Sequence, residues 1–488
     1  MDFNDNKIMK GFFWKSLERF GVLGVQFILR IVLARLLDPE HYGILALMMV
    51  FITIANVFVQ SGFNTALIQN KDVEEEDYSS VFWISLGIAA IIYGIIFLSA
   101  PLIAHIYKMS SIVAPLRILA LMLFPGALNS VQFAKVSREM DFKKGFYSNL
   151  TGCLVSGFVG IIIAYKGAGL WALVVQSILN VCVICLVMKF TVKLRICLKC
   201  NWSRIKALFS YGWKLVVSSL LNSVVEDIRS LVIGIKYNSD TLGNYNQGMQ
   251  LPQYAMNVIQ SSVSGVMLPA ISEQQSEKAK AKQIMKNAIS LGAFIIFPLM
   301  AGIAAVAPSF VDILLTSKWL GCVPYMRIYC LIFAFYPIYT CNLQAINAMG
   351  RSDIFLKLEL IKQGYNLAVI TIAVFFFQTP MAIAVSAVLC IPINLFINGY
   401  PNKKLIDYPI SEQVCDFIQP GIISLVMFGV CYFIEFFGFS SIITILLQIA
   451  VGFIFYITAS LIFKSSSFGK ILMVLKALME KNWNKEVI

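Results

Sequence analysis

The chain has 488 residues, of which 59% are hydrophobic and 13% are charged. Soluble globular domains are about 45–50% apolar and about 25% charged. This composition therefore excludes a soluble enzyme, a secreted domain or a DNA-binding regulator, despite a formal net charge of +13. The sequence predicts an all-α integral membrane protein that is not an enzyme and does not bind nucleic acid.

About fourteen apolar stretches are long enough to cross a bilayer as helices, since roughly 20 residues suffice. The strict alternation of transmembrane β-strands is absent. The first stretch contains Glu18 and Arg19 and lacks a small-residue cleavage site, so we expect no cleavable signal peptide. The expected spans lie near residues 11–37, 43–69, 79–104, 112–136, 146–166, 169–192, 208–236, 242–271, 284–308, 319–348, 354–377, 380–400, 415–437 and 441–463.

The positions of the basic residues predict the orientation of the spans. With the N-terminus inside, 30 of the 39 Lys and Arg residues lie in inner segments or their flanks, and 8 lie at outer ends. Excess positive charge marks cytoplasmic loops. We therefore expect both termini in the cytoplasm.

The C-terminal segment 466–488 carries a helical stripe of apolar residues with lysines between them. That pattern is typical of an amphipathic helix on an anionic leaflet. A frayed polar tail is the alternative.

Signals for catalysis or metal binding are weak throughout the chain. No GxxxxGK[ST] phosphate loop is present, and the two histidines, His41 and His105, lie apart at outer loops. Cys182-x-x-Cys185 and Cys197-x-x-Cys200 are single pairs, for which free thiols are the simpler interpretation. We expect no catalytic residue, no metal site and no cofactor beyond a possible coupling H⁺ or Na⁺.

The chain matches itself at a shift near 200 residues. Trp14, Lys15 and Arg30 fall on Trp213, Lys214 and Arg229, and the same order of matches continues in later spans. Examples are Gly43 with Gly243, Ser61-Gly62 with Ser264-Gly265, and Leu116-Arg117-Ile118 with Met326-Arg327-Ile328. We therefore predict two homologous six-helix lobes, 1–200 and 201–405, followed by two extra helices in 406–465. Parallel repeats of this kind are typical of alternating-access transporters, whose binding site lies between the lobes.

Polar residues form stripes on the first span of each lobe. Lys15, Arg19, Gln26 and Arg30 fall within ~60° at 100° per residue. In the seventh span, Lys214, Ser218, Asn222 and Arg229 do the same. Charges inside a bilayer are costly unless they face a cavity or a partner. Arg19 could pair with Glu18, Arg229 with Glu226, and Arg30 could reach the outer interface.

Amide stripes continue on the second and eighth spans. The residues that we expect to line a hydrated cavity are Asn56, Gln60 and Asn64, then Gln250, Gln253, Asn257 and Gln260. The tenth span adds aromatic and amide side chains, including Tyr336, Tyr339 and Asn342. The alternative is that such amides only hold helices together.

Arginine forks match pairs of phosphate oxygens, and rows of amides suit hydroxyl groups. These stripes therefore indicate a phosphorylated, carbohydrate-like cargo. Asp227 lies on the other side of its span from Arg229, and with Glu226 it is a candidate for carrying a coupling ion. A helix–helix salt bridge is the alternative for Asp227.

Several ordered stretches resemble a known family. They are Trp14-Lys15 to Arg19, the segment Ala34 to Gly43, the segment Ser61 to Gln69, Tyr78-Ser79-Ser80, the segment Arg138 to Lys144, and the segment Ala348 to Asp353. In these residues the chain is similar to polysaccharide flippases of the multidrug/oligosaccharidyl-lipid/polysaccharide exporter superfamily. The resemblance is nearest to the O-antigen, colanic acid and teichuronic acid exporter branch, and it runs to about the twelfth span.

The resemblance implies a bacterial inner-membrane protein of two six-helix lobes plus two helices, and alternating-access flipping of an undecaprenyl-diphosphate-linked oligosaccharide. It implies that Arg19, Arg30 and Arg229 are the positions that could recognise the diphosphate. It also implies a groove for the lipid tail at the last two helices. Membrane lipids, and possibly a glycan polymerase and glycosyltransferases, are expected partners of a monomeric chain.

Three alternatives stay open at this point. A multidrug cation antiporter of the same superfamily uses carboxylates in its first span, whereas the first span here carries arginines. A peptidoglycan lipid-precursor flippase would use similar arginine chemistry. A membrane-embedded glycan polymerase or ligase would need larger outer loops than the roughly ten residues expected here.

Overall fold

The computed structural model describes residues 3–61, 67, 74–192, 194, 196–197, 216–217, 219–220, 223–225, 227–465 and 467–469. Within the first helix, the side chains of residues 3–13, 15, 16 and 19 lie outside the described set. Contacts divide the chain into two units, Met1–Asn246 and Gln247–Ile488. The division falls inside the helix α10 (Ser239–Ser272).

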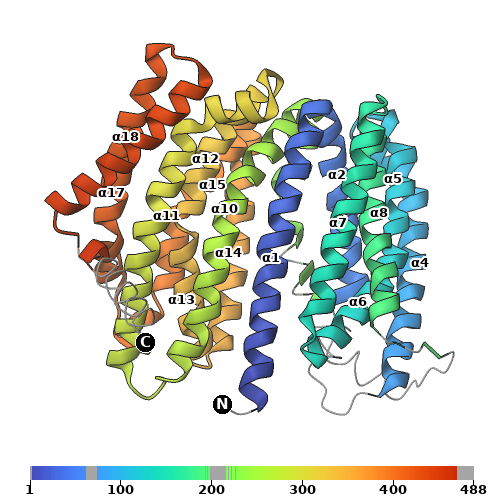
Figure 1. Cartoon of the computed structure of the whole chain (residues 1–488), viewed down its shortest axis with the longest axis horizontal. Coiled ribbons are helices and arrows are strands. Elements are labelled where there is room, and N and C mark those ends of the chain that lie inside the picture. Colours follow the sequence, from blue (N-terminus) through green and yellow to red (C-terminus); the bar gives the residue numbers. More distant parts are fainter. Residues whose placement is uncertain are drawn as a thin grey trace, which may run out of the picture. The chain divides into compact units, whose positions relative to one another are not determined.

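Unit 1 is built from long helices joined by short turns (Figure 1). They are α1 (Phe3–Leu36), α2 (Pro39–Asn56), the π-helical turn η1 (Val57–Ser61), α4 (Glu75–Ile106), η2 (Ser110–Ile112), α5 (Val113–Leu119), η3 (Ala120–Met122), α6 (Leu123–Glu139), α7 (Phe142–Tyr165) and α8 (Leu170–Thr191). Helix α7 packs against both α1 and α8.

Unit 2 follows the same pattern (Figure 1). After α10 come α11 (Lys278–Leu315), η4 (Ser317–Cys322), α12 (Val323–Ala334), α13 (Tyr336–Ala348), α14 (Ser352–Phe376), α15 (Pro380–Gly399), α16 (Asn402–Ile406), α17 (Ile410–Ile434), η5 (Glu435–Phe437) and α18 (Ser441–Ile462). Helix α11 packs against α12, α17 and α18.

The predicted all-α membrane fold is confirmed. The described residues contain no strand, and 11 of their helices are long and apolar enough to span a membrane. Helices α1 and α10 coincide with the stretches expected at 11–37 and 242–271. Much of the span expected at 208–236, and the tail beyond residue 469, lie outside the described residues.

Helix starts follow from local chemistry. Helix α2 begins with Pro39 directly after Asp38, whose backbone N–H donates to Nδ1 of His41 at 3.4 Å. Helix α4 begins in an acidic run, where the backbone N–H of Glu74 donates to Oδ2 of Asp77 at 2.9 Å. The first turn of a helix tolerates proline, and negative charge stabilises a helix N-terminus. These contacts fix where the two helices enter the bundle.

Two glycines matched by the repeat lie against each other within unit 1. A Cβ atom on Gly43 would lie 1.8 Å from the carbonyl oxygen of Ser239, and one on Gly243 would lie 1.9 Å from that of Pro39. Only glycine allows the first turns of α2 and α10 to approach so closely. The contact is reciprocal, because residues 39 and 43 of α2 oppose residues 243 and 239 of α10.

The two helices that follow the predicted lobes form a core with α11. Tyr456 of α18 donates its hydroxyl to the carbonyl of Phe294 at 2.9 Å, and Gln448 donates to the carbonyl of Cys431 at 3.0 Å. Buried Met427 of α17 packs in the same cluster. Polar side chains thus satisfy each other where apolar helices meet.

Candidate functional site

The side chain of Arg229 has unsatisfied hydrogen-bond donors in the described part of the chain. Its side chain is partly buried, and its Nε and Nη2 atoms are buried without a hydrogen-bond partner in the described part of the chain. Removing a guanidinium from water without a partner is costly. Glu226, its expected alternative partner, lies outside the described residues. The guanidinium of Arg229 therefore retains the capacity to bind an anion.

Arg30, its counterpart in the repeat, has more partners. Its guanidinium carbon lies 5.7 Å from the ring centroid of Tyr42, and the Tyr42 hydroxyl donates to the Arg30 carbonyl at 3.5 Å. This packing holds Arg30 near the C-terminal end of α1. The cation–π contact leaves the positive charge in place.

The rest of the α1 stripe is only partly described. Gln26 is exposed, whereas the side chain of Arg19 lies outside the described residues. Glu18, the predicted alternative partner of Arg19, is buried and accepts a hydrogen bond of 2.7 Å from Nδ2 of Asn149 in α7. Glu18 therefore joins α1 to α7.

Asn56 and Gln60 form a local pair. Nε2 of Gln60 donates to Oδ1 of Asn56 at 3.0 Å across the turn at η1. A Cβ atom on Gly126 of α6 would lie 3.1 Å from Nε2 of Gln60, so both amides pack close to that helix. Single π-helical turns are frequent at functional sites. Asn64 lies outside the described residues.

The amides of α10 behave differently. Each is partly exposed, and within the described chain none makes a side-chain hydrogen bond. They fall within ~80° of one another on the helix at 100° per residue. Unpaired amides on a membrane helix suit contact with water or a polar cargo. The residues are Gln250, Gln253, Asn257 and Gln260.

The polar residues expected near Tyr336 differ in how far the structure buries them. Tyr336 is partly exposed, and its ring packs 5.1 Å from that of Phe333. Tyr339 is buried and donates its hydroxyl to the carbonyl of Ile391 at 3.2 Å. Asn342 is also buried, which matches the helix-joining alternative for this residue.

Asn342 belongs to a buried amide cluster. Its Nδ2 donates to Oε1 of Gln413 at 3.0 Å, and its Oδ1 accepts from Nδ2 of Asn402 at 2.7 Å. Gln413 in turn donates to the carbonyl of Tyr408 at 3.2 Å. The cluster fixes α13, α16 and α17 together, because breaking one bond strands a buried partner.

The Tyr408 hydroxyl extends this cluster toward charged groups. It donates to Oδ2 of Asp416 at 2.5 Å, and Nζ of Lys286 lies 3.4 Å from the other oxygen of that carboxylate. Burial and the Asp416 carboxylate raise the pKa of Tyr408 above its ordinary value, so the phenol stays protonated and donates.

Asp227 is partly buried and makes no hydrogen bond or ion pair with any described residue. The predicted salt bridge to another helix is therefore not seen among those residues. Glu226 and Asn222 lie outside them. Asp227 stays a candidate for carrying a coupling ion.

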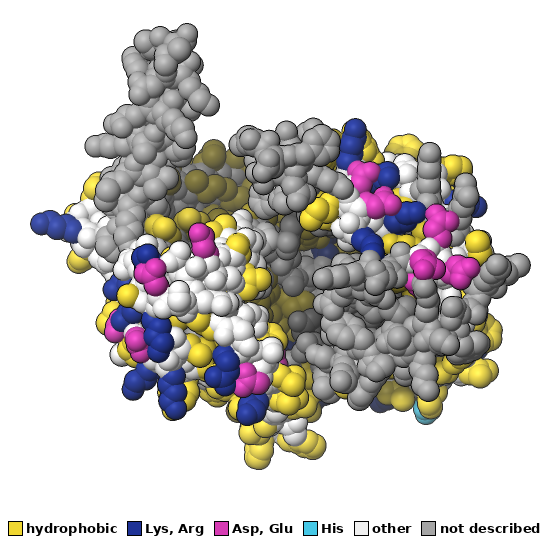
Figure 2. All heavy atoms as spheres, turned by 90° about the horizontal axis from the view of Figure 1, so that it is seen from below, with side chains coloured by type: hydrophobic (Ala, Val, Ile, Leu, Met, Phe, Trp, Pro, Cys, Tyr) yellow, Lys and Arg dark blue, Asp and Glu magenta, His cyan; other side chains and the backbone are white. Residues whose placement is uncertain are grey.

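Basic side chains lie among acidic ones on the face that Figure 2 presents. Lys282 lies 2.7 Å from Glu412, Lys280 lies 2.9 Å from Glu277, and Lys144 lies 3.0 Å from Asp141. Exposed pairs of this kind contribute little stability. All six residues lie at or just before the starts of α7, α11 and α17.

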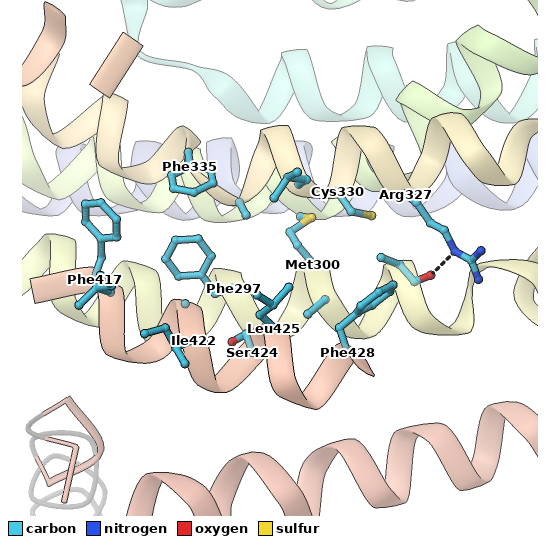
Figure 3. A pocket seen from close by; sticks show the side chains of 16 residues that line it. Phe297, Met300, Arg327, Cys330, Phe335, Phe417, Ile422, Ser424, Leu425 and Phe428 are labelled. Carbon is cyan, nitrogen blue, oxygen red and sulfur yellow. Dashed lines mark hydrogen bonds between the residues drawn. The ribbon is translucent and has the colours of Figure 1, made fainter. Parts of the chain in front are cut away.

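An apolar pocket of about 420 Å³ lies within unit 2, where α17 meets α11 and α12 (Figure 3). Phe297, Phe417 and Leu425 are among its lining residues, and Arg327 lies at one end. Of the last two helices, at which the resemblance implies a lipid-tail groove, α17 contributes to the lining of this pocket and α18 does not.

In the residues that the structure describes, no group of three His, Cys, Asp or Glu side chains could hold a metal. Cys182 and Cys185 are free and partly buried, and Cys197 is free and exposed. Cys200 lies outside the described residues.

The sequence did not predict the contact of Tyr42 with Arg30 or the place of Asn402 in the amide cluster. It also did not predict the contacts of Arg117 that are described below. The repeat offered one usable signal, because it aligned Arg117 with Arg327. Nothing in the sequence spacing linked Asn402 to Asn342, since these residues come from different helices.

Comparison with known proteins supports the transporter interpretation. A family model described as polysaccharide biosynthesis protein matches residues 32–324. The teichuronic acid biosynthesis protein TuaB of Bacillus subtilis is 22% identical over 92% of this chain and 94% of its own length. The succinoglycan biosynthesis transport protein ExoT of Rhizobium meliloti is 22% identical over 65% of this chain and 64% of its own.

Two solved structures share the fold. The lipid II flippase MurJ, in an inward closed conformation, matches with a TM-score of 0.75 and 18% identity over 93% of this chain and 98% of its own. An inward-facing multidrug transporter of the MATE family and MOP superfamily matches with a TM-score of 0.63 and 14% identity over 80% and 98%. The family match spans more than half of the sequence, and this chain belongs to the polysaccharide biosynthesis protein family.

Proposed function

We propose that this protein flips a lipid-linked oligosaccharide, joined to its lipid through a diphosphate, across the bacterial inner membrane. The observation that carries the proposal is the Arg229 guanidinium, whose Nε and Nη2 atoms are buried without a partner among the described residues. A guanidinium binds phosphate oxygens through two parallel hydrogen bonds. A diphosphate would supply the acceptors that the described residues do not.

The α10 amides and Tyr336 are proposed sugar contacts. Gln250, Gln253, Asn257 and Gln260 keep both donors and acceptors available on one face of the helix. The TuaB and ExoT relatives are named for polysaccharide biosynthesis, and ExoT also for transport. Arg30 and Arg19 complete the proposed set of basic contacts, with Gln26, Asn56, Gln60, Asn64 and Asn222 as further polar contacts.

The apolar pocket in unit 2 is the proposed contact for part of the polyprenyl tail (Figure 3). A volume of about 420 Å³ lies within the range of protein ligand sites. The positive-inside distribution supports an inner-membrane location with both termini in the cytoplasm. Alternating access, with Asp227 or Glu226 carrying a coupling H⁺ or Na⁺, is the proposed mode of transport, and the two lobes predicted at 1–200 and 201–405 are its proposed moving parts.

The test is deletion of the gene, followed by fractionation of lipid-linked oligosaccharides. We expect the deletion strain to accumulate these lipids on the cytoplasmic face, and the intact chain to restore export. Accumulation of the peptidoglycan lipid precursor instead would show that the cargo is misassigned. Normal export in the deletion strain, with no other transporter responsible, would contradict the proposal.

A further inference from the structure

A second hollow opens in unit 1, away from the predicted polar stripes. It has a volume of about 570 Å³ and lies where α4, η2, α5 and the start of α8 meet. Its lining combines aromatic rings, two serine hydroxyls and one cation. These residues are Tyr93, Phe97, Ser110, Ser111, Arg117 and Trp171.

Arg117 is held in this hollow by one residue of α4. Its Nε donates to the carbonyl of Phe97 at 3.0 Å, and its guanidinium carbon lies 4.0 Å from the centroid of the Phe97 ring. Among the described residues no carboxylate pairs with Arg117. The two terminal nitrogens therefore have hydrogen-bonding capacity that this part of the protein does not use.

Arg327, its match in the repeat, sits in nearly the same arrangement within unit 2. Its Nε donates to the carbonyl of Ala304 in α11 at 3.1 Å, as Figure 3 shows, and its guanidinium carbon lies 4.8 Å from the ring centroid of Tyr432. Both arginines thus bind a backbone carbonyl of the preceding long helix and lie over an aromatic ring.

The two sites differ in two partners: the ring at Arg327 comes from α17 whereas that at Arg117 comes from α4, and among the described residues only Arg327 has a carboxylate partner. Nη2 of Arg327 donates to Oε2 of Glu435 at 3.0 Å, and Glu435 lies in η5 directly after α17. Helix α17 belongs to the two helices that follow the predicted lobes, so the first lobe has no equivalent of it. A cation at a membrane interface is stabilised by an anion. Unit 2 supplies that anion, whereas the described part of unit 1 does not.

We propose that the hollow at Arg117 binds the phosphate headgroup of an anionic membrane phospholipid. The terminal guanidinium nitrogens and the exposed hydroxyls of Ser110 and Ser111 supply donors for the phosphate oxygens. Trp171 and Tyr93 have the amphipathic rings that favour the headgroup level. Exposed Phe97 and Ile118 offer apolar surface to the start of the acyl chains.

This site is independent of the transport function proposed above. It uses no residue of the predicted cargo site. If the N-terminus is cytoplasmic, the headgroup belongs to the outer leaflet of the inner membrane, because α5 follows the outer end of α4.

The test uses the full-length chain in nanodiscs that contain equal amounts of phosphatidylglycerol and phosphatidylethanolamine. Native mass spectrometry then counts the lipids that stay bound. We expect the unmodified protein to retain phosphatidylglycerol preferentially. Arg117→Gln should lower this preference about fivefold, in line with one basic side chain near a membrane surface. Lys166→Gln removes a positive charge from the turn before α8, outside the hollow, and should leave the preference unchanged.

Further variants separate lipid binding from misfolding. Arg117→Lys should keep part of the preference, because charge remains while the paired donors are lost. Ser110→Ala with Ser111→Ala should lower it less than Arg117→Gln. Unfolding midpoints identify any variant that fails to fold. If Arg117→Gln fails to fold, Arg117→Lys serves as the test in its place.

Three outcomes would overturn the proposal. An unchanged lipid preference in Arg117→Gln would show that the guanidinium does not bind the headgroup. Equal loss of both lipids would show that charge is not recognised. Capture of a protein by a photoreactive residue at position 118 would identify a partner helix as the occupant.

Discussion

Two groups of amides in unit 2 have the same side-chain chemistry but different surroundings. Asn342, Asn402 and Gln413 are buried and bonded to one another. Gln253 and Asn257 of α10 are partly exposed and make no hydrogen bond with described residues. The first group holds helices together, whereas the second keeps its donors and acceptors for water or cargo. Whether an amide has a hydrogen-bond partner distinguishes these roles better than its residue type does.

Arg229 is the strongest case of an unsatisfied polar group, and its loss should have the largest effect. Arg229→Ala should lower transport by roughly a hundredfold, because charge-assisted hydrogen bonds contribute about 1.5–3 kcal/mol each. Transport is measured per molecule of protein in the membrane. Arg229→Lys should recover part of the activity, and Arg351→Ala, which removes an exposed guanidinium paired with Asp353, should have no effect.

Replacement of Asp227 tests whether its carboxylate carries the coupling ion. Asp227→Asn should abolish the acceleration of transport by a proton or sodium gradient, because the neutral amide cannot exchange an ion. Initial rates with and without each gradient provide the measurement. Unchanged acceleration would remove Asp227 from the mechanism.

The buried amide cluster should affect stability more than transport. Asn342→Ala removes the donor to Oε1 of Gln413 and the side-chain acceptor of Nδ2 of Asn402, so we expect a loss of about 1–3 kcal/mol in the free energy of unfolding. Thermal unfolding in detergent measures the shift. We expect normal transport per folded molecule. A transport defect without destabilisation would show that Asn342 acts in transport and contradict its helix-joining role.

The α10 amides should affect transport more than stability. Gln253→Ala and Asn257→Ala should each lower transport about fivefold, since a neutral hydrogen bond contributes roughly 0.5–1.5 kcal/mol. Their unfolding midpoints should stay close to that of the unmodified protein. If these variants unfold earlier and transport normally, the two groups of amides have the same role.

Much of the fold was predictable from the apolar stretches. The span expected at 441–463 is the helix Ser441–Ile462, and the span expected at 354–377 is Ser352–Phe376. Hydrophobic length and turn residues determine these limits locally. The repeat also matched Gly43 with Gly243, although it did not show that the two residues lie against each other.

The site was predictable only as a set of candidates. Helical spacing placed Tyr339 and Asn342 among polar residues, but their partners, Ile391 and Gln413, lie 52 and 71 residues away. Likewise, Glu18 is bonded to Asn149, 131 residues along the chain. Side-chain periodicity defines a face of one helix and does not define what packs on it.

The most direct test of the central claim is flipping by the purified chain in liposomes. The cargo is an undecaprenyl-diphosphate-linked oligosaccharide, and the comparison cargo carries the same sugar on an uncharged lipid. We expect the unmodified protein to flip the diphosphate-linked cargo faster, and Arg229→Ala to lose that advantage. Equal flipping of both cargoes by the two proteins would contradict diphosphate recognition by Arg229.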